Sequence, residues 1–404
     1  MSTLVARQIL DVARELASDI IEWRRYLHAH PETGAETPET AAYVAGILGD
    51  LGLEIRTGVG GYGVVGVLRG STDNGRSDPR TLAIRADMDA LNVQEGTGLE
   101  FASKVPGKMH ACGHDGHVAM ALGAATVLSR IKDEIRGNVK FIFQPAEEGP
   151  GGAKPMIEDG VLRDPKVDAI VGLHMGCIWN VPTGSVGVKP GAMMAAMDRF
   201  EVLVKGKGGH GAMPHQTSDA LYVGAQIVSA LQGIVSRRTN PLAPIVITVG
   251  QFHSGSAFNI IPGTAWLEGT TRCLDEELRA RIPVMIRDVA QGVAATMGAE
   301  CEVTYHLGYP VLVNDRDFTG FFAGVARDVL EAAGGGTVGE LPEPTMGGED
   351  MAYYLREVPG TFFFLGSRPE VAYPHHNSKF DIDESTLPLG AALLAETARR
   401  WLAK

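Results

Sequence analysis

Three histidines, a cysteine and an aspartate lie within one short stretch of the chain, HACGHDGHVAM at 110–120. Thiol, imidazole and carboxylate groups are the side chains that bind transition metals, and a cysteine can also act as a nucleophile or form a disulfide. A nucleophile would need an activating base and an oxyanion site. A disulfide from Cys112 to Cys177 is the weakest of these explanations. We favour a metal site.

The spacing of Cys112 and His114 restricts how this stretch can be folded. Residues two apart share a face on extended backbone but not on a helix. Cys112 and His114 can therefore face one centre if the helix begins after them, and Gly113 would ease that geometry. A segment that is helical throughout would instead align His110, His114 and His117. We favour the extended arrangement, with GHVAMALGAA as a packing helix.

Polar residues also stand where three predicted strands end. The first strand reaches Asp87 and Asp89, the second Glu147 and Glu148, and the third His174. In a wound parallel sheet, functional sites form outside the carboxyl ends of the strands. This convergence is stronger evidence for a site than any single motif.

Glu147 and Glu148 are adjacent, which suggests a division of labour. On extended backbone, neighbouring side chains point in opposite directions. One carboxylate could then bind a metal while the other accepts a proton from a metal-bound water of lowered pKa.

The elements that position these residues follow an α/β pattern. Short, continuously apolar runs predict strands that are covered on both faces, as in a mainly parallel sheet wound by helices. Helical spacing predicts helices over the first thirty residues and from Pro38 to Gly52. The four predicted strands in this half are at 64–68, 81–91, 139–148 and 167–176.

The pattern changes near residue 190. From there to about residue 308 the expected order is β-α-β-β-α-β, which suits a ferredoxin-like α+β sandwich inserted into the larger domain. Helix and strand patterns of the first domain resume after residue 310. We therefore predict a discontinuous catalytic domain, 1–188 and 309–404, and an inserted domain, 189–308.

Composition narrows the class of protein. The 404 residues are 45% hydrophobic and 21% charged, with a net charge of −12, which argues against nucleic acid or an anionic membrane as a partner. We expect neither a membrane span nor a signal peptide, since no long apolar run is present. Four cysteines form no disulfide framework, so we expect a cytoplasmic protein.

Taken together, several stretches resemble the M20 metallopeptidases, in particular the branch of aminoacylases and hippurate hydrolases (N-acyl amino acid amidohydrolases). They occur in order between residues 24 and 384 and cover essentially the whole chain. The stretches are RRYLHAHPETGAET, GVGGYGVVGVLRG, RADMDAL, MHACGHDGHVAMALGAA, FQPAEEGPGGA, GLHMG, GKGGHGAMPHQTSDA, FNIIPGTAWLEGTTR, GGEDMAYY and PHHNSKFDIDE.

The resemblance implies two divalent metal ions per subunit, bridged by the cysteine, and Glu147 as general base and proton shuttle. Zinc suits thiolate and imidazole best, with manganese, cobalt or nickel as alternatives. Between His375 and His376, the spacing to Phe380 favours His376. The implied ligands are Cys112, His114, Glu148, His174 and His376.

The resemblance also assigns roles outside the metal centre. The inserted domain would be a dimerisation or lid module, so we expect a homodimer or a dimer of dimers. His210 would stabilise the oxyanion of the transition state, and Asn259 and Arg272 would bind the free carboxylate of the substrate. Asp87 and Asp89 would lie beneath the site. Glu349 and Asp350 match an active-site loop of unassigned role.

The expected reaction is hydrolysis of an N-acyl amino acid, hippurate-like or with another acyl group, to a carboxylic acid and a free amino acid. Its nucleophile would be a metal-bound hydroxide formed with the help of Glu147. A dipeptidase or carboxypeptidase of the same family is the alternative. A metal-binding protein without hydrolytic activity is the alternative from a different class.

Overall fold

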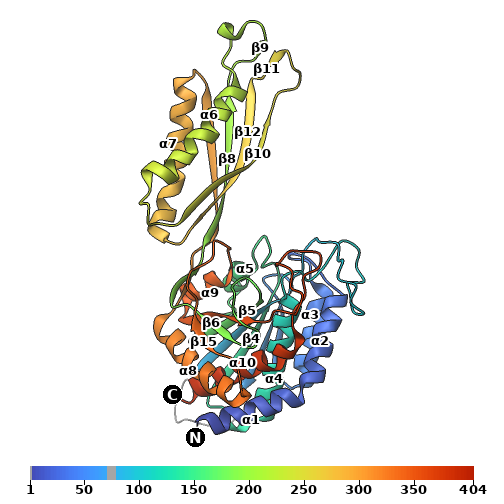
Figure 1. The fold of residues 1–404 in the computed structure, drawn as a ribbon. Helices are drawn as coiled ribbons and strands as arrows, with labels where there is room; N and C mark the ends of the chain where they lie inside the picture. Colours follow the sequence, from blue (N-terminus) through green and yellow to red (C-terminus); the bar gives the residue numbers. More distant parts are fainter. Residues whose placement is uncertain (1, 71–78) are drawn as a thin grey trace. The chain divides into compact units, whose positions relative to one another are not determined.

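The computed structural model describes residues 2–70 and 79–404. The chain forms two compact units (Figure 1). The first consists of Met1–Gly191, Val313–Glu343 and Tyr353–Lys404, and the second of Ala192–Leu312 and Pro344–Ala352. None of the described helices has the length and apolar character needed to cross a membrane.

An eight-stranded sheet runs through the described part of the first unit, in the order β1-β2-β4-β3-β5-β16-β6-β15. The strands predicted from apolar runs are present as β2, β3, β4 and β5. The bounds are β1 Glu54–Val59, β2 Gly63–Arg69, β3 Thr81–Asp87, β4 Asn138–Gln144, β5 Ala169–Gly176, β6 Val186–Val188, β15 Val338–Glu340 and β16 Gly360–Gly366.

The centre of this sheet is parallel, as expected. β4, β3, β5 and β16 are parallel neighbours, and every residue of these four strands is buried. The strand β2 differs, because it is antiparallel to both β1 and β4 although it is almost as completely buried. A continuous apolar run reports burial on both faces of a sheet, and that burial does not depend on strand direction.

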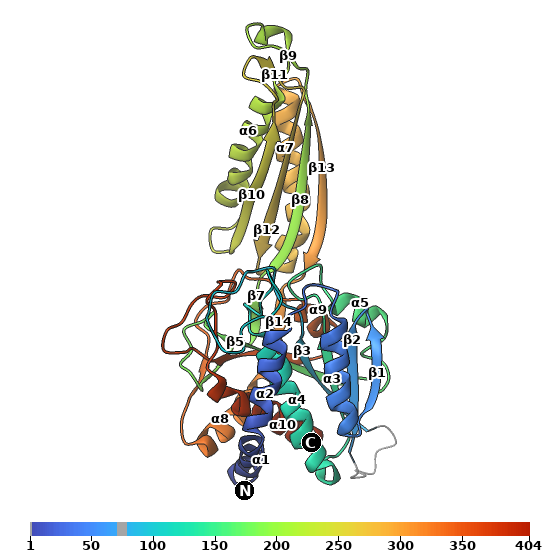
Figure 2. The same ribbon diagram turned by 90° about the vertical axis from the view of Figure 1, so that its right-hand side faces the viewer.

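Helices of the first unit cover the sheet and one another (Figures 1 and 2). Buried residues of α4, α8 and α10 share one hydrophobic core with residues of the central strands. The helices are α1 Ser2–Glu15, α2 Ala17–Ala29, α3 Pro38–Asp50, α4 His114–Arg130, α5 Ala153–Glu158, α8 Arg316–Ala333, α9 Met351–Glu357 and α10 Leu387–Leu402, with short 3-10 turns at Lys132–Glu134 and Glu384–Thr386.

The N-terminal helix predicted over thirty residues is two helices, α1 and α2. The break lies at Leu16, whose ψ of 5° departs from helical geometry. The amphipathic spacing nevertheless continues across the break, because Leu16 is itself buried in the core. The second predicted helix is confirmed as α3, with Pro38 in its first turn.

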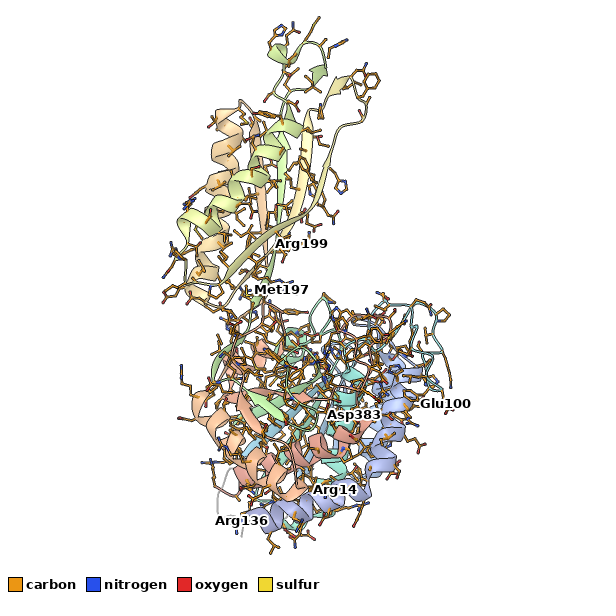
Figure 3. All side chains as sticks on the ribbon, viewed as in Figure 1. Arg14, Glu100, Arg136, Met197, Arg199 and Asp383 are labelled. Atoms are coloured by element: carbon orange, nitrogen blue, oxygen red, sulfur yellow. The ribbon has the colours of Figure 1, made fainter. Side chains whose placement is uncertain are left out.

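The second unit contains a four-stranded antiparallel sheet in the order β10-β12-β8-β13, with α6 and α7 packed against it. Alternate residues of β8 are buried against these helices. Met197 and Arg199, labelled in Figure 3, belong to the other, more exposed set. The elements are β7 Gly191–Met194, β8 Ala196–Lys205, β9 Gly209–His210, α6 Ala220–Gly233, β10 Ile245–Ser254, β11 Ile260–Ile261, β12 Thr264–Cys273, α7 Glu276–Thr296 and β13 Glu300–Tyr309, with short helical turns at Pro214–Gln216 and Ile234–Arg238. The short strand β14, Leu312–Asn314, stands at the boundary, since its last two residues belong to the first unit.

The helix α4, which begins at the chemically rich stretch, makes close contacts at a glycine. A methyl group at Gly123 would lie 2.8 Å from Cδ1 of Ile20 and 2.9 Å from Cβ of Ala391. The glycine therefore lets α2 and α10 approach α4 closely and fixes the helix in the core.

We expect Gly123→Ala to lower the free energy of unfolding by about 1–3 kcal/mol, because the added methyl overpacks this contact. Gly320→Ala is the matched control, since Gly320 lies on the exposed side of α8 with no atom within 4 Å of an added methyl. The control should raise stability by about 0.5–1 kcal/mol. Urea unfolding followed by tryptophan fluorescence measures both. A Gly123→Ala protein as stable as the wild type would contradict the packing argument.

Candidate metal centre

The residues predicted from strand ends do meet at one edge of the central sheet. Asp87 is the last residue of β3, Glu147 and Glu148 follow β4, and His174 lies near the end of β5. The helix expected to begin after both Cys112 and His114 begins at His114 itself, with Cys112 and the N-cap Gly113 before it. Gly113 has a φ of +89°, a conformation that glycine adopts without strain. Ligand atoms of Cys112, His114 and Glu148 all lie within 4.8 Å of one another.

The ring of His114 is oriented by a backbone carbonyl. Its Nδ1 lies 2.8 Å from the carbonyl oxygen of Asp89 and therefore carries the proton. The other nitrogen, Nε2, is buried without a hydrogen-bond partner among the described residues. Burial opposes a charge on this ring, but the carboxylates of Asp87, Asp89 and Glu148 outweigh it and raise the pKa of His114 to about 10.

Glu147 and Glu148 are held by the same aspartate. Their backbone N–H groups donate to the two oxygens of Asp89, at 2.8 and 3.0 Å. The expected extended backbone is wrong here, because the two glutamates lie in a turn that follows Ala146, a residue with φ of +62°. A carboxylate oxygen of each glutamate lies 4.0 Å from Nε2 of His114, so both approach one centre instead of pointing apart.

His174 presents a bare nitrogen to Cys112. Its Nδ1 lies 2.9 Å from the carbonyl oxygen of Met175, and its Nε2 lies 3.5 Å from Sγ of Cys112. Burial and the surrounding imidazoles hold the pKa of His174 well below its usual value. The ring is therefore neutral, as a metal ligand must be.

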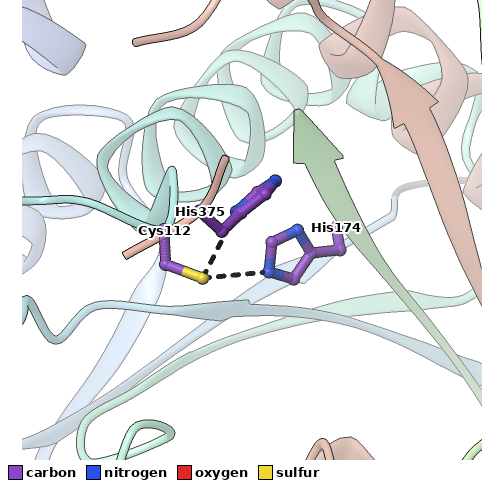
Figure 4. Close-up of side chains that lie close together, drawn as sticks. All are labelled: Cys112, His174 and His375. Carbon is purple, nitrogen blue, oxygen red and sulfur yellow. Dashed lines mark hydrogen bonds between the residues drawn. The ribbon is translucent and has the colours of Figure 1, made fainter. Parts of the chain in front are cut away.

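A turn near the C-terminus brings two more histidines. Nε2 of His376 lies 3.1 Å from Oε1 of Glu148, while Nδ1 of His375 lies 3.5 Å from Sγ of Cys112 (Figure 4). The backbone N–H of His376 donates to the carbonyl oxygen of Ala111, next to Cys112 in the chain. Both histidines thus border the centre, and the choice of His376 as the ligand stays a prediction.

His117 and Asp87 lie next to the centre and form hydrogen bonds to other residues. His117 is satisfied at both nitrogens, with Nδ1 at 2.6 Å from Asp87 and Nε2 accepting from the backbone of Met175. Asp87 is shared with Arg85, whose guanidinium lies 2.7 Å from it. His117 and Asp87 therefore support the centre from behind.

A buried charge network that includes Asp115 of α4 was not predicted from the sequence. Arg24 is 1% exposed and lies 2.8 Å from Asp115, 2.8 Å from Asp381 and 3.1 Å from Glu384. His28 lies 2.8 Å from the same oxygen of Asp115. Arg24 and His28, both in the stretch RRYLHAH, are one helical turn apart and share a helix face. No local pattern identifies their partners, which are more than 80 residues away in the chain.

The donor set fits a divalent cation. Buried oxygen and nitrogen atoms are normally hydrogen-bonded, yet Nε2 of His114 has no hydrogen-bond partner in the described structure. Burial and the nearby carboxylates of Glu148 and Glu147 hold the pKa of the Cys112 thiol well above its usual value. A cation would reverse that effect, and a sulfur, nitrogen and oxygen set suits zinc and similar ions.

Other predicted residues belong to the second unit. His210 is exposed in β9, which pairs with β11, and Asn259 is also exposed. Arg272 lies half-buried in β12, and its guanidinium makes no hydrogen bond to a described residue. Glu349 and Asp350 are buried and group with this unit.

Comparison with known proteins identifies a family. Residues 83–400 match the Peptidase_M20 family model, described as peptidase family M20/M25/M40. The N-acyl-L-amino acid amidohydrolase of Geobacillus stearothermophilus is 44% identical over 314 residues, 77% of this chain and 82% of that protein. Thermostable carboxypeptidase 1 of Saccharolobus solfataricus is 44% identical over 392 residues, 95% of this chain and 96% of that protein.

A solved structure agrees in fold. The Bacillus subtilis YXEP protein, described as a dinuclear metal binding peptidase from the M20 family, is similar with a TM-score of 0.82 and 36% identity. The match covers 97% of this chain and 99% of that one.

We expect the affinity for zinc to rise steeply with pH. In the metal-free protein both the Cys112 thiol and the His114 ring are protonated at neutral pH, because their pKa values lie above it. Binding as thiolate and neutral imidazole would release about two protons, which corresponds to about 100-fold in affinity per pH unit. Chelator competition between about pH 6.5 and 8.5 measures this slope.

A Cys112→Ser variant is the control, since loss of the thiol should reduce the slope by about one proton. An affinity that stays constant across this range would contradict the protonation states assigned to Cys112 and His114.

Proposed function

Since the chain belongs to peptidase family M20/M25/M40 and is a metal-dependent amide hydrolase, we propose that it hydrolyses N-acyl amino acids to a carboxylic acid and a free amino acid. The observation that carries this proposal is the pair of glutamates anchored to Asp89. Glu148 belongs to the ligand group with Cys112 and His114, while Glu147 lies beside that group at the same distance from His114. One carboxylate can therefore bind a metal while its neighbour moves a proton.

Cys112, His114, Glu148, His174 and His376 are the residues that would hold two divalent ions. The dinuclear metal binding peptidase among the similar structures supports this number. Zinc is the preferred ion for this donor set, with manganese, cobalt and nickel as alternatives. When bound, such ions supply Lewis acidity toward a substrate carbonyl and toward water.

The remaining steps belong to side chains of the protein. Glu147 accepts a proton from the attacking water and returns it to the amide nitrogen as the C–N bond breaks. One water is consumed, a C–O bond forms, and the amine leaves as the free amino acid. His210 donates a hydrogen bond to the oxyanion that develops on the carbonyl oxygen.

Asn259 and Arg272 are proposed to bind the carboxylate of the substrate. A guanidinium offers two parallel N–H donors, which match the two oxygens of a carboxylate. Arg272 supports this role because its guanidinium is half-buried and makes no hydrogen bond to a described residue. Burial lowers the pKa of this group, but an arginine stays protonated at neutral pH.

We also propose that residues 189–308 form a ferredoxin-like lid or dimerisation domain inserted into a catalytic domain of residues 1–188 and 309–404. The assembly would be a homodimer or a dimer of dimers. A cytoplasmic location is supported by the four cysteines, all of which are free thiols in the structure.

A carboxypeptidase activity is the second candidate, because a relative of that name is 44% identical over most of the chain. Both activities would use the same metal centre and the same carboxylate-binding residues. They differ in whether the group on the acyl side is a simple acyl chain or a peptide. The remaining alternative is a metal-binding protein without hydrolytic activity.

We expect Glu147→Gln to lower kcat by about 10²–10⁴-fold, because the amide cannot accept a proton. The metal content of this variant should equal that of the wild type. Glu148→Gln is the matched control, and it should lose metal as well as activity. Metal analysis and steady-state kinetics of both proteins test the assignment. Near-normal turnover by Glu147→Gln would sink it.

A substrate panel separates the two candidate activities. We expect hippurate and N-acetyl amino acids to be cleaved with higher kcat/KM than N-blocked dipeptides, and carboxamide analogues of the same substrates to be poor. Arg272→Lys should raise KM for the acids by about 10–100-fold, since the paired hydrogen bonds to the carboxylate are lost. A preference for blocked dipeptides would favour the carboxypeptidase. No turnover of any substrate with metal bound would favour a binding protein.

A further inference from the structure

The sulfur of Cys112 lies close to two imidazole rings. Sγ is 3.5 Å from Nε2 of His174 and 3.5 Å from Nδ1 of His375 (Figure 4). These two histidines come from different parts of the chain, one from β5 and the other from the turn near the C-terminus. One ligand atom from each of the three residues lies within 4.8 Å of the other two, so both ring nitrogens approach the sulfur from the same side.

The two rings present opposite groups to the sulfur, as their far nitrogens reveal. Nδ1 of His174 faces the carbonyl oxygen of Met175, which only accepts, so Nδ1 is protonated and Nε2 is a bare lone pair. Nε2 of His375 faces the backbone N–H of Cys177 at 3.1 Å, which only donates. Nε2 of His375 is therefore bare, and its proton is on Nδ1, pointing at Sγ.

The surroundings of His375 hold the ring in this orientation. A methyl group at position 176 would lie 2.5 Å from Nε2 and 2.6 Å from Cε1 of His375, so the ring fits only because residue 176 is glycine. Gly176 has a φ of +115°, which also requires glycine. The ring of Phe380 packs at 4.5 Å on the same imidazole.

We propose that His375 is a positioning residue that donates its Nδ1–H to the sulfur of Cys112, while His174 and His376 bind metal. In the metal-free protein the thiol donates to Nε2 of His174 and accepts from His375. When a metal takes the thiolate, the bond from His375 remains and directs the sulfur lone pairs. This inference rests on the proposed metal centre.

The hydrogen bond has a consequence for the metal. A donor to the sulfur stabilises the thiolate that metal binding requires and lowers the energy of the sulfur lone pairs, so its loss would weaken metal binding and shift the charge-transfer band to lower energy. Groups that orient ligands in this way typically change metal affinity by roughly 10–100-fold when they are replaced.

The test compares His375→Leu with the nearly isosteric His375→Asn, both loaded with cobalt(II). The asparagine side chain places an N–H donor close to the position of Nδ1, whereas leucine has none. We expect the thiolate-to-cobalt charge-transfer band of His375→Leu to move to lower energy and its cobalt affinity to fall by roughly 10–100-fold. The cobalt content at saturation should stay that of the wild type. His375→Asn should restore both the band and the affinity.

His110→Leu is the matched control, because His110 is also buried and its nitrogens have no hydrogen-bond partner among the described residues. It should leave the band in place. An unchanged band and affinity in His375→Leu would overturn the inference about His375 and leave the proposed function intact. Loss of a cobalt equivalent in both His375 variants would make His375 a ligand and would also overturn it. A wild-type protein with no thiolate band would overturn the metal centre itself.

A second measurement does not depend on the folding of the leucine variant. In the zinc-loaded wild type labelled with ¹⁵N-histidine, the His375 resonances are assigned by comparison with His375→Asn. A proton on Nδ1 and none on Nε2 supports the inference, whereas a proton on Nε2 overturns it.

Discussion

The hydrogen bonds accepted by Asp89 are the interactions on which the metal centre depends. The two carboxylate oxygens accept hydrogen bonds from the backbone N–H groups of Glu147 and Glu148. The backbone carbonyl oxygen of Asp89 accepts the ring proton of His114. One residue thus fixes both glutamates and one histidine by bonds to backbone atoms, which leave little freedom. These hydrogen bonds orient the ligand atoms toward one centre.

Electrostatics completes this arrangement. Several carboxylates surround a buried thiol and a buried imidazole, and together they keep protons on groups that would have to lose them to bind metal. A divalent cation satisfies the same carboxylates as those protons do. A metal at this position would therefore compete with protons for the same carboxylates, and Arg85, Asp87 and His117 form a hydrogen-bonded group beside it.

Much of this centre could be predicted from the sequence, for reasons specific to its residues. Cys112 lies just before a helix and His114 is the first residue of that helix, while Asp87, Glu147 and His174 follow or end apolar strands, so topology alone gathers them. The orientation of Glu147 and Glu148 could not be predicted, because it depends on a turn at Ala146 with positive φ. The direction of β2 was equally inaccessible, since burial on both faces looks the same in parallel and antiparallel strands. The hydrogen bond from His375 depends on which nitrogen Cys177 contacts, and spacing carries no such information.

The Arg24 network has a consequence for how the protein is made. Asp115 adjoins His114, and the arginine that pairs with it also binds Asp381 and Glu384, more than 350 residues later in the chain. On the ribosome, the helix that carries His114 emerges long before those acidic partners do. Contacts of such sequence separation form late and slowly. A growing polypeptide can therefore pair Arg24 with Asp115 at an early stage, but the buried network is complete only once residues 381–384 have been synthesised.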